Sequence, residues 1–462
     1  MQPLAISPLL LLLAGAVIAL VTGIFLPRRR QVWIAVFAIA AMAVSALLAG
    51  WKLPAPPGWV FHRSFAVDLP FLTTWLVLMA AGAGCVLLSI PVFRRDAREA
   101  EYYVLMMFSL LGAGALAGAH DIMEIVLGVL LTAVPSYAMV AWRRADRLAS
   151  EGLLKYYLLG ALLNIGLVYG FVLIYGLSGS TILDELAPRP GTDVLFLVAI
   201  VLVLAGLGFK AGYVPAHFWI PDVYQATTIP VAAFLSVIPK IAAVLALTRL
   251  AVAFPAERFD MTPLIAIVAA VTMSWGNIAA FRQTDIRRLL GYSTIAQTGY
   301  LLIGAALAGE ARLALPGLLY YFAAYAAANL GAFAVLGATG RYTIAEHRGL
   351  VRRHPWLAAA MLVALMSLMG LPPLAGFVGK LLLFIAAMDG AYIWLAVAGL
   401  INSVLSLFYY LRVLTPMFLD VPDRSPGAVE PVARGLAVMA AGLSLVLGLA
   451  APLLLVQPVA MG

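Results

Sequence analysis

The sequence predicts an all-α polytopic membrane protein that crosses a bilayer many times. Of its 462 residues, 64% are hydrophobic and 11% are charged, whereas a soluble globular chain carries about 25% charged residues. So little polar surface cannot cover a water-soluble protein. Within lipid, only helices or closed barrels satisfy the hydrogen bonds of the backbone, and the long unbroken apolar runs of this chain are typical of helices.

The expected membrane helices occupy almost the whole chain. About fourteen apolar runs have roughly the length needed to cross a bilayer; they cover 6–26, 32–51, 70–92, 101–118, 121–141, 153–177, 192–213, 230–253, 261–281, 286–306, 315–338, 356–378, 380–414 and 434–456. The boundary near residue 379 is the least defined, and the run 380–414 could contain a break. Because the connections are short, we expect one transmembrane domain over residues 1–462.

Basic loops predict the orientation of the helices. When the loops are assigned alternately to two sides, Lys and Arg gather on one of them, in 27–30, 94–98, 142–147, 282–288, 341–354 and 420–434. Loops 51–63, 183–191, 254–260 and 309–312 fall on the other. By the positive-inside rule the first side is cytoplasmic, so both termini are expected in the periplasm. The net charge of +8 therefore indicates orientation rather than an anionic partner such as a nucleic acid.

The basic cluster follows the first apolar run instead of preceding it, which is typical of an uncleaved helix rather than of a signal peptide. Cys85 is the single cysteine, so the chain cannot build an iron–sulfur cluster or a structural zinc site. It contains no phosphate-binding or dinucleotide-binding glycine motif. Small-residue runs such as GAGALAG (112–118) indicate close helix packing. We expect no metal and no cofactor in this chain.

Lysines in or beside apolar runs are the main chemical signal; they are Lys155, Lys210, Lys240 and Lys380. A charged lysine that faces lipid at mid-membrane is costly. It is tolerated when it faces the protein interior, has a counter-charge or loses its proton, and such an amine can take up and release protons. The alternative is that these side chains extend to the interface, which suits Lys155 best because it lies near a basic loop.

Proline-containing segments accompany these lysines. Lys240 ends SVIPK and Lys380 ends GLPPLAGFVGK, so we expect a helix break beside each, since proline removes a backbone donor. Freed backbone at membrane depth must line an enclosed or hydrated cavity, as an ion pathway requires; kinks that serve only packing are the alternative. His217 follows Pro215 and suits a proton relay, or else belongs to an aromatic belt at the interface.

A faint internal similarity predicts inverted repeats. The segment LLKYYLLGALLNIG (153–166) resembles LLYYFAAYAAANLG (318–331) with a one-residue slip. The two segments lie five expected helices apart, and an odd offset gives the copies opposite orientations in the membrane. Chance similarity between two helices rich in tyrosine and small residues is the alternative.

Four stretches together carry a resemblance to a known family; they are KYYLLGALLNIGLVYG, FKAGYVPAHFWIPDVYQATTIPVAAFLSVIPK, GNIAAFRQTDIRRLLGYSTIAQTGYLLIG and LMGLPPLAGFVGKLLLF. They resemble the antiporter-like membrane subunits of respiratory complex I over about residues 100–415. The joined PVAAFLSVIPK and GFVGK motifs favour the subunit N branch over the L and M branches and over Mrp-type antiporters.

The resemblance implies fourteen helices with breaks in the seventh and twelfth. Three N-terminal helices in 1–100 would precede two inverted five-helix repeats, in 101–253 and 261–415, and a last helix in 434–456. It also implies proton translocation across a bacterial inner membrane, driven by quinone reduction in other subunits of the complex. NADH, FMN, iron–sulfur clusters and quinone would be bound by those partner subunits.

The family's proton-carrying positions transfer residue by residue. Lys155 in KYYLLG matches the lysine of the sixth helix, and Lys210 in FKAG matches the central lysine of the seventh. His217 matches the histidine that follows it. Lys240 matches the lysine of the eighth helix, and Lys380 matches the lysine of the twelfth, near the proton exit.

One family position departs from the pattern. The fifth helix reads GVLLTAVP, with Leu130 where the family has a glutamate five residues before Pro135. That glutamate is expected to pair with Lys210, so its loss removes an anion that would stabilise the charged amine. Glu124 lies six residues earlier, about 9 Å along a helix and on a different face, so it is an auxiliary entrance group or an interfacial residue.

Three functions stay open at this stage. The first is a proton-translocating subunit of a complex I-type enzyme, either the main copy or a divergent second copy. The second is a subunit of an Mrp-like cation/proton antiporter. The third is a non-pumping structural subunit, which the change at Leu130 allows. The four lysines and the proline breaks argue against the third, because a scaffold has no use for costly amines inside a membrane.

Overall fold

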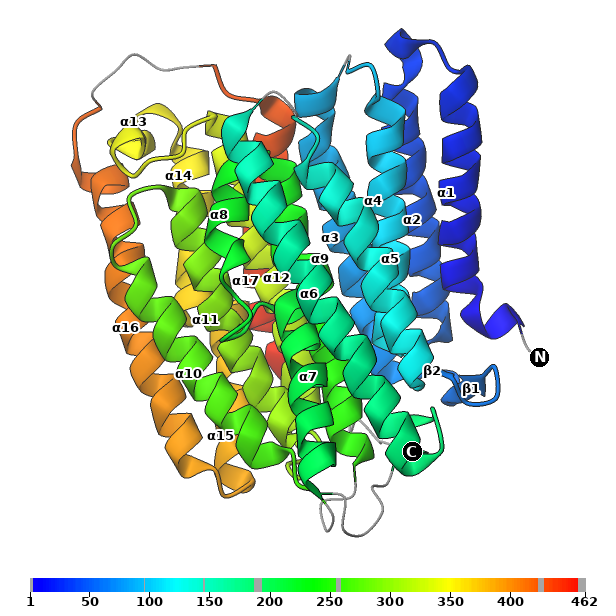
Figure 1. The fold of residues 1–462 in the computed structure, drawn as a ribbon. Coiled ribbons are helices and arrows are strands. Elements are labelled where there is room, and N and C mark those ends of the chain that lie inside the picture. The colour runs from blue at the N-terminus through cyan, green and yellow to red at the C-terminus, as the bar shows by residue number, and fades with distance from the viewer. Residues whose placement is uncertain are drawn as a thin grey trace. The chain divides into compact units, whose positions relative to one another are not determined.

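The computed structural model describes residues 3–94, 96–143, 146–186, 193–254, 259–422 and 428–455, and these are almost entirely helical (Figure 1). Five of the loops used to predict the orientation lie partly outside the described residues; they are 94–98, 142–147, 183–191, 254–260 and 420–434. The chain forms two compact units. Unit 1 contains Met1–Val86, Val92–Trp219 and Ile238–Leu264, and unit 2 contains Leu87–Pro91, Ile220–Val237 and Ile265–Gly462.

The first unit holds the N-terminal helices. In chain order its elements are η1 (Pro3–Ile6), α1 (Ser7–Phe25), η2 (Arg28–Arg30), α2 (Val32–Lys52), β1 (Gly58–Val60), β2 (Phe65–Val67), most of α3 (Leu69–Phe93), α4 (Glu99–Gly118), α5 (Ile122–Val140), α6 (Arg147–Ser178), η3 (Leu183–Glu185), α7 (Asp193–Ala211) and the second half of α9 (Ile229–Ala253). The strands β1 and β2 form one antiparallel hairpin.

Close packing of α4 on α5 explains the small-residue run predicted from the sequence. A Cβ atom added to Gly112 would lie 2.4 Å from the backbone nitrogen of Thr132, and one added to Gly128 would lie 2.7 Å from that of Leu116. Glycine at these positions lets two backbones approach within contact distance, which is how membrane helices gain packing energy without a hydrophobic driving force.

The second unit is built around α12. Its elements are α8 (Trp219–Ala226), α10 (Thr262–Ala280), α11 (Ile286–Leu307), α12 (Ala314–Thr339), η4 (Ala345–His347), α13 (Leu350–Arg353), α14 (Pro355–Met369), α15 (Ala375–Asp389), α16 (Ile393–Leu419) and α17 (Pro431–Leu455). The helix α12 packs against α11, α14, α15 and α17, so most of its side chains are buried.

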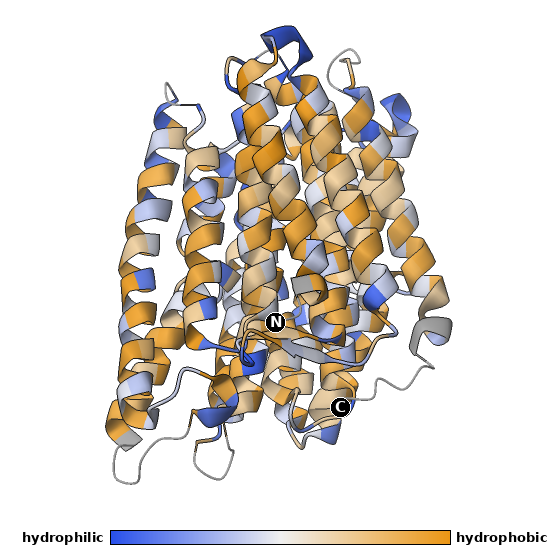
Figure 2. Ribbon diagram, turned by 90° about the vertical axis from the view of Figure 1, so that its right-hand side faces the viewer, coloured by the Kyte–Doolittle hydropathy of each residue, from blue (hydrophilic) through white to orange (hydrophobic). Residues whose placement is uncertain are grey.

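Twelve helices in the described part of the chain are long and apolar enough to cross a membrane, which confirms the all-α membrane fold. In Figure 2, hydrophobic residues run along the helices and hydrophilic ones gather toward their ends. The helix α11 is not one of the twelve; it buries Ser293, Thr294, Gln297 and Thr298. The count of fourteen therefore stays a prediction.

Two interrupted helices lie where breaks in the seventh and twelfth spans were expected. Residues 212–218 separate α7 from α8, and residues 370–374 separate α14 from α15. The last helical turn before each gap is followed by a glycine in the left-handed region, Gly212 with φ 81° and Gly370 with φ 87°, a conformation that side chains with a Cβ rarely adopt.

Two expectations about helix boundaries were wrong. The boundary near residue 379 does not exist, because Pro372 and Pro373 interrupt the helix earlier and α15 continues through Lys380 to Asp389. The expected break beside Lys240 is also absent, since α9 runs through Pro239 without interruption. Pro239 lacks the N–H that would bond to the carbonyl of Leu235, and the neighbouring carbonyl of Ser236 accepts a hydrogen bond from the Tyr325 hydroxyl at 2.6 Å.

Replacing Gly112 by alanine tests the close contact of α4 with α5. The added methyl group would overlap the backbone of Thr132, so we expect a loss of about 1–3 kcal/mol in the free energy of unfolding, measured as a lower midpoint of thermal unfolding in detergent. The control is Gly176→Ala, also inside a helix, where a Cβ atom meets nothing within 4 Å. Equal midpoints for the two variants would contradict the predicted contact.

Candidate functional site

Lys210 lies in the last turn of α7 and only 2% of it is exposed. Among the described residues its Nζ atom has no hydrogen-bond partner. Aromatic rings surround it instead: the ring centroids of Tyr137, Tyr156 and Phe209 lie 5.7, 6.0 and 5.9 Å from Nζ. The negative faces of such rings attract a cation, so this pocket accepts an ammonium group without a neighbouring carboxylate.

The end of α7 leaves backbone carbonyls that side chains then satisfy. The carbonyl of Phe209 accepts the Trp219 indole N–H at 3.0 Å, and that of Ala211 accepts the Lys240 ammonium at 2.6 Å. Lys240 is 1% exposed. A cation at a helix C-terminus is stabilised by the partial negative charge of the last carbonyls. The interruption of α7 thus creates the binding place for the Lys240 amine.

His217 belongs to the gap between α7 and α8. It is 3% exposed and its ring lies 4.4 Å from that of Phe218, centroid to centroid. His217 thus lies in the interruption that follows Ala211, whose carbonyl accepts the Lys240 amine. Within unit 1, the structure gathers Lys210, Lys240 and His217 around the C-terminal end of α7.

The second unit repeats the contact between an amine and a broken helix. Lys380 is 2% exposed, and its Nζ donates to the carbonyls of Leu368 at 2.8 Å and Met369 at 3.2 Å. These are the last residues of α14. Nζ also contacts the Ser403 hydroxyl at 3.3 Å and lies 4.0 Å from the ring centroid of Tyr300. As with Lys240, a buried amine meets the carbonyl end of an interrupted helix.

A buried chain of polar side chains continues from the Lys380 contact. The Gln297 amide donates to the Leu368 carbonyl at 2.9 Å and its oxygen accepts from Tyr321. The Gln297 amide also donates to the Tyr410 hydroxyl at 3.5 Å, and Tyr410 bonds in turn to Ser293. Hydroxyl and amide groups of this kind both donate and accept. The sequence analysis missed this set of polar residues. The polar residues within the weakly apolar α11 could have indicated it.

Lys155 differs from the other three lysines. Its side chain is 42% exposed and pairs with Glu151 of the same helix at 2.8 Å, four residues apart. The adjacent Tyr156, in contrast, is fully buried against Lys210. The structure therefore does not show Lys155 buried with the others, and its exposure fits the interfacial alternative.

Leu130 lies on the outward face of α5. It is 43% exposed and belongs to a stripe of exposed apolar residues with Met123, Leu127 and Val134. Tyr137, two turns further along the same face and about 10 Å away along the axis, is the α5 residue whose ring lies nearest Lys210. Sequence reasoning missed Tyr137, because a tyrosine in an apolar helix carries no pattern of its own.

Glu124 lies in the first turn of α5, near the helix end. The N-cap residue Asp121 accepts hydrogen bonds from the Met123 amide and the Thr181 hydroxyl, both at 2.6 Å. An acidic residue in the first turn is favoured by the helix dipole. This position fits an end-of-helix role and places Glu124 away from the level of Leu130.

Comparison with known proteins identifies the family. The family described as "NADH:quinone oxidoreductase/Mrp antiporter, TM" matches residues 119–406. Subunit N of the NADH-quinone oxidoreductase of Mycobacterium sp. (strain JLS) is 42% identical over 460 residues, covering 98% of this chain and 97% of the relative. Subunit N 1 of Streptomyces griseus is 42% identical over 459 residues, with the same coverage.

Solved structures agree with this assignment. A chain of respiratory complex I from Thermus thermophilus is 34% identical, with a TM-score of 0.85 and coverage of 98% of this chain and 100% of that one. A chain of the Mrp complex from Dietzia sp. DQ12-45-1b shares the fold, with a TM-score of 0.87 at 22% identity over 98% and 96% of the two chains. The chain belongs to the NADH:quinone oxidoreductase/Mrp antiporter transmembrane family and, within it, to the subunit N branch.

Replacing Lys380 by methionine tests the contact at the end of α14. The buried carbonyls of Leu368 and Met369 would lose this donor, so we expect a loss of about 1–3 kcal/mol in the free energy of unfolding, read from thermal unfolding in detergent. Lys52→Met is the matched control, because the Lys52 amine also donates to a backbone carbonyl, that of Leu4 at 2.8 Å, but at an exposed position. Similar losses in both variants would refute the importance of burial.

Proposed function

We propose that this chain is a membrane-arm subunit of a proton-pumping NADH–quinone oxidoreductase. It would carry protons along Lys210, His217, Lys240 and Lys380 in the bacterial inner membrane. NADH, FMN, iron–sulfur clusters and quinone would be bound by partner subunits, among them the other membrane subunits of a complex I. The observation that carries the proposal is the placement of buried amines at the carbonyl ends of two interrupted helices.

The chemistry of these contacts supports proton transfer. A lysine amine can bind and release a proton, and the carbonyl oxygens at a helix end accept hydrogen bonds from its charged form. Amines held at these ends could therefore receive and pass on protons during turnover. The aromatic pocket of Lys210 offers a weaker stabilisation of the charged form than a carboxylate would.

Local structure supports the proposed inverted repeats, residues 101–253 and 261–415. In unit 1, Asp121 caps α5 and its backbone bridges to Ile182, just beyond the end of α6. In unit 2, Asp285 caps α11 and bridges to Thr343, just beyond the end of α12. Both second helices end at a glycine in the left-handed region. These are also the helices whose sequences resemble each other.

We expect proton transfer to be weakest at Lys210, because Leu130 cannot provide a negative charge. In the absence of a glutamate there, we propose that Lys210 relies on the rings of Tyr137 and Tyr156 and that coupling at this step is reduced. Lys155, paired with Glu151, would serve at most as an interfacial proton donor or acceptor. Glu124 would act as an auxiliary group at the entrance.

The relatives and the basic loops support the proposed location. The relatives named above are bacterial, and Lys and Arg concentrate in loops on one side of the expected helices. We therefore propose that both termini face the periplasm.

The experiment that tests the function is a tagged purification from native membranes in mild detergent, with identification of the partners and an assay of NADH–quinone reductase activity. Partners that carry flavin and iron–sulfur clusters, together with reductase activity, would support the proposal. Recovery with antiporter-type membrane subunits alone and sodium-dependent transport would instead favour the Mrp-like function, whose fold this chain shares. Reductase activity that never acidifies the medium would favour a structural subunit.

Replacing Lys240 by methionine removes the titratable group at the end of α7. In reconstituted vesicles we expect proton uptake coupled to NADH oxidation to fall by about tenfold or more, the scale typical of a lost proton-transfer group, with the complex still assembled. Lys52→Met, an exposed lysine outside the pathway, should pump normally. Normal pumping by Lys240→Met would remove this residue from the proposed axis.

Replacing Leu130 by glutamate tests the reduced coupling. If the missing carboxylate limits the step at Lys210, the variant should raise the number of protons moved per electron, because an anion on α5 favours the charged amine. Leu127→Glu is the matched control, since Leu127 lies on the same outward stripe and is 53% exposed. An unchanged ratio in an active Leu130→Glu complex would show that coupling does not depend on this position.

A further inference from the structure

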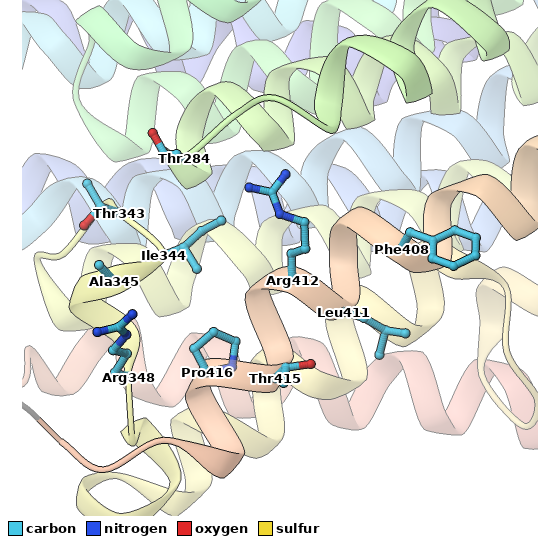
Figure 3. Close-up of a pocket in the computed structure, with 10 residues that line it drawn as sticks. All are labelled: Thr284, Thr343, Ile344, Ala345, Arg348, Phe408, Leu411, Arg412, Thr415 and Pro416. Atoms are coloured by element: carbon cyan, nitrogen blue, oxygen red, sulfur yellow. The ribbon is translucent and has the colours of Figure 1, made fainter.

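A groove of about 560 Å³ opens in unit 2, and none of its lining residues belongs to an interrupted helix. Its walls are the last turns of α16, the residues just before α11 and the segment 343–348. Figure 3 shows Arg412 extending from α16 toward the segment that carries Thr284, with Arg348 on the other side of the groove. Hydroxyl groups come from Thr284, Thr343 and Thr415.

The apolar floor of the groove continues along α16. Phe408 and Leu411, which line it, are 57% and 47% exposed. They extend a stripe of exposed side chains on the same helix that includes Val397, Ile401 and Val404. From Val397 to Phe408 the helix rises about 16 Å, close to half of the roughly 30 Å hydrocarbon core. The stripe thus matches the length of acyl chains in one leaflet.

In the groove, the exposed apolar side chains of α16 are followed within one helical turn by a positively charged one. Arg412 follows Phe408 by four residues, so the two side chains share a helix face. Its guanidinium donates to the backbone carbonyl of Phe281, and a guanidinium has five N–H donors in all. Among the described residues no carboxylate pairs with Arg412, whereas Arg348 pairs with Asp420 at 3.2 Å. Arg412 therefore supplies the uncompensated positive charge of the groove.

The opposite wall is held in place by its own hydrogen bonds. The Glu346 carboxylate accepts from the backbone amides of Tyr342 at 3.0 Å and Thr343 at 2.9 Å, and from the Thr343 hydroxyl at 2.8 Å. These donors, chiefly the Thr343 amide, lower the pKa of Glu346 to about 2. The Glu346 carboxylate is thus hydrogen-bonded within its own loop, and these bonds hold this wall of the groove in place without a ligand.

We propose that this groove binds an anionic phospholipid, with its phosphodiester against Arg412 and the threonine hydroxyls and an acyl chain along the exposed face of α16. Guanidinium groups bind phosphate oxygens through paired N–H donors, and basic pockets between membrane helices bind anionic headgroups. A zwitterionic lipid would satisfy the apolar stripe equally well but gains less from the net charge of the site. The inference requires that the chain spans a bilayer and is independent of proton transport.

The test uses the whole assembled complex in vesicles of phosphatidylcholine that contain phosphatidylglycerol with a photoreactive acyl chain. Cross-linked peptides are identified by mass spectrometry, and a phosphatidylcholine probe with the same chain serves as the reference. We expect cross-links on α16 near Phe408, with the anionic probe about fivefold preferred, the factor that corresponds to one arginine near a membrane surface. Equal cross-linking by the two probes would overturn the proposal.

Substitutions at Arg412 test whether the preference for the anionic lipid arises in this groove. Arg412→Gln should reduce the anionic probe to the level of phosphatidylcholine, and Arg412→Lys should keep part of the preference because the charge stays while the paired donors are lost. Arg434→Gln, an exposed arginine of α17 outside the groove, should change nothing. If Arg412→Gln and Arg434→Gln behave alike, the groove is not the binding site.

Competition on the unmodified complex covers the case in which a variant fails to assemble. Unlabelled phosphatidylglycerol should displace the probe from α16, and inorganic phosphate at the same concentration should not, because it lacks the acyl chain. Displacement by inorganic phosphate alone would assign the groove to a free anion. Absence of any lipid cross-link, with a partner subunit's acidic segment cross-linked to Arg412 instead, would assign it to a protein contact.

Discussion

The contact between a buried lysine and the carbonyl end of an interrupted helix organises this structure. Lipid cannot hydrogen-bond the groups that a helix end exposes, and a buried ammonium needs oxygen partners. The two groups provide hydrogen-bond partners for each other. The Lys240 amine donates to the carbonyl of Ala211 at the end of α7, and the Lys380 amine donates to the carbonyls of Leu368 and Met369 at the end of α14. At these two places each group lowers the cost of burying the other.

Lys210 is a buried lysine whose amine has no hydrogen-bond partner among the described residues. It lies one residue before Ala211, but its amine faces aromatic rings and not the carbonyls that receive Lys240. Rings attract a cation less strongly than a carboxylate in direct contact does. Leu130 on the outward face of α5 carries no charge, and the ring contacts of Lys210 distinguish this amine from those of Lys240 and Lys380, which donate to carbonyls.

The fold by itself does not separate the possible functions. A chain of an Mrp complex matches this structure as well as a complex I chain does, at lower sequence identity, and the same fold can host different activities. Sequence identity over the full length assigns the branch. What the branch then does depends on its partner subunits, and in the proposed function the buried amines described above would be the part of the proton path that this chain contributes.

The sequence alone determined the membrane fold and, through Pro372 and Pro373, the interruption before Lys380, whereas the break in the seventh helix was expected only from the resemblance to the family. Long apolar runs require helices in lipid, and Gly212 and the pair Pro372–Pro373 act through their own backbone restrictions, so both effects are local. Local reasoning failed at Pro239, where α9 continues and the Tyr325 hydroxyl of a distant helix donates to the nearby carbonyl of Ser236. It also failed at the boundary near residue 379.

Partner choice was decided only by the tertiary structure. The sequence set Lys155 apart by its nearness to a basic loop, and it is exposed and pairs with Glu151. It did not distinguish Lys240 and Lys380, whose amines meet helix ends, from Lys210, whose amine meets rings. The outward position of Leu130 and the role of Tyr137 belong to the same class of fact. Each depends on which distant segment packs against a given helix face, and spacing along one chain cannot specify that because many packings satisfy the same periodicity.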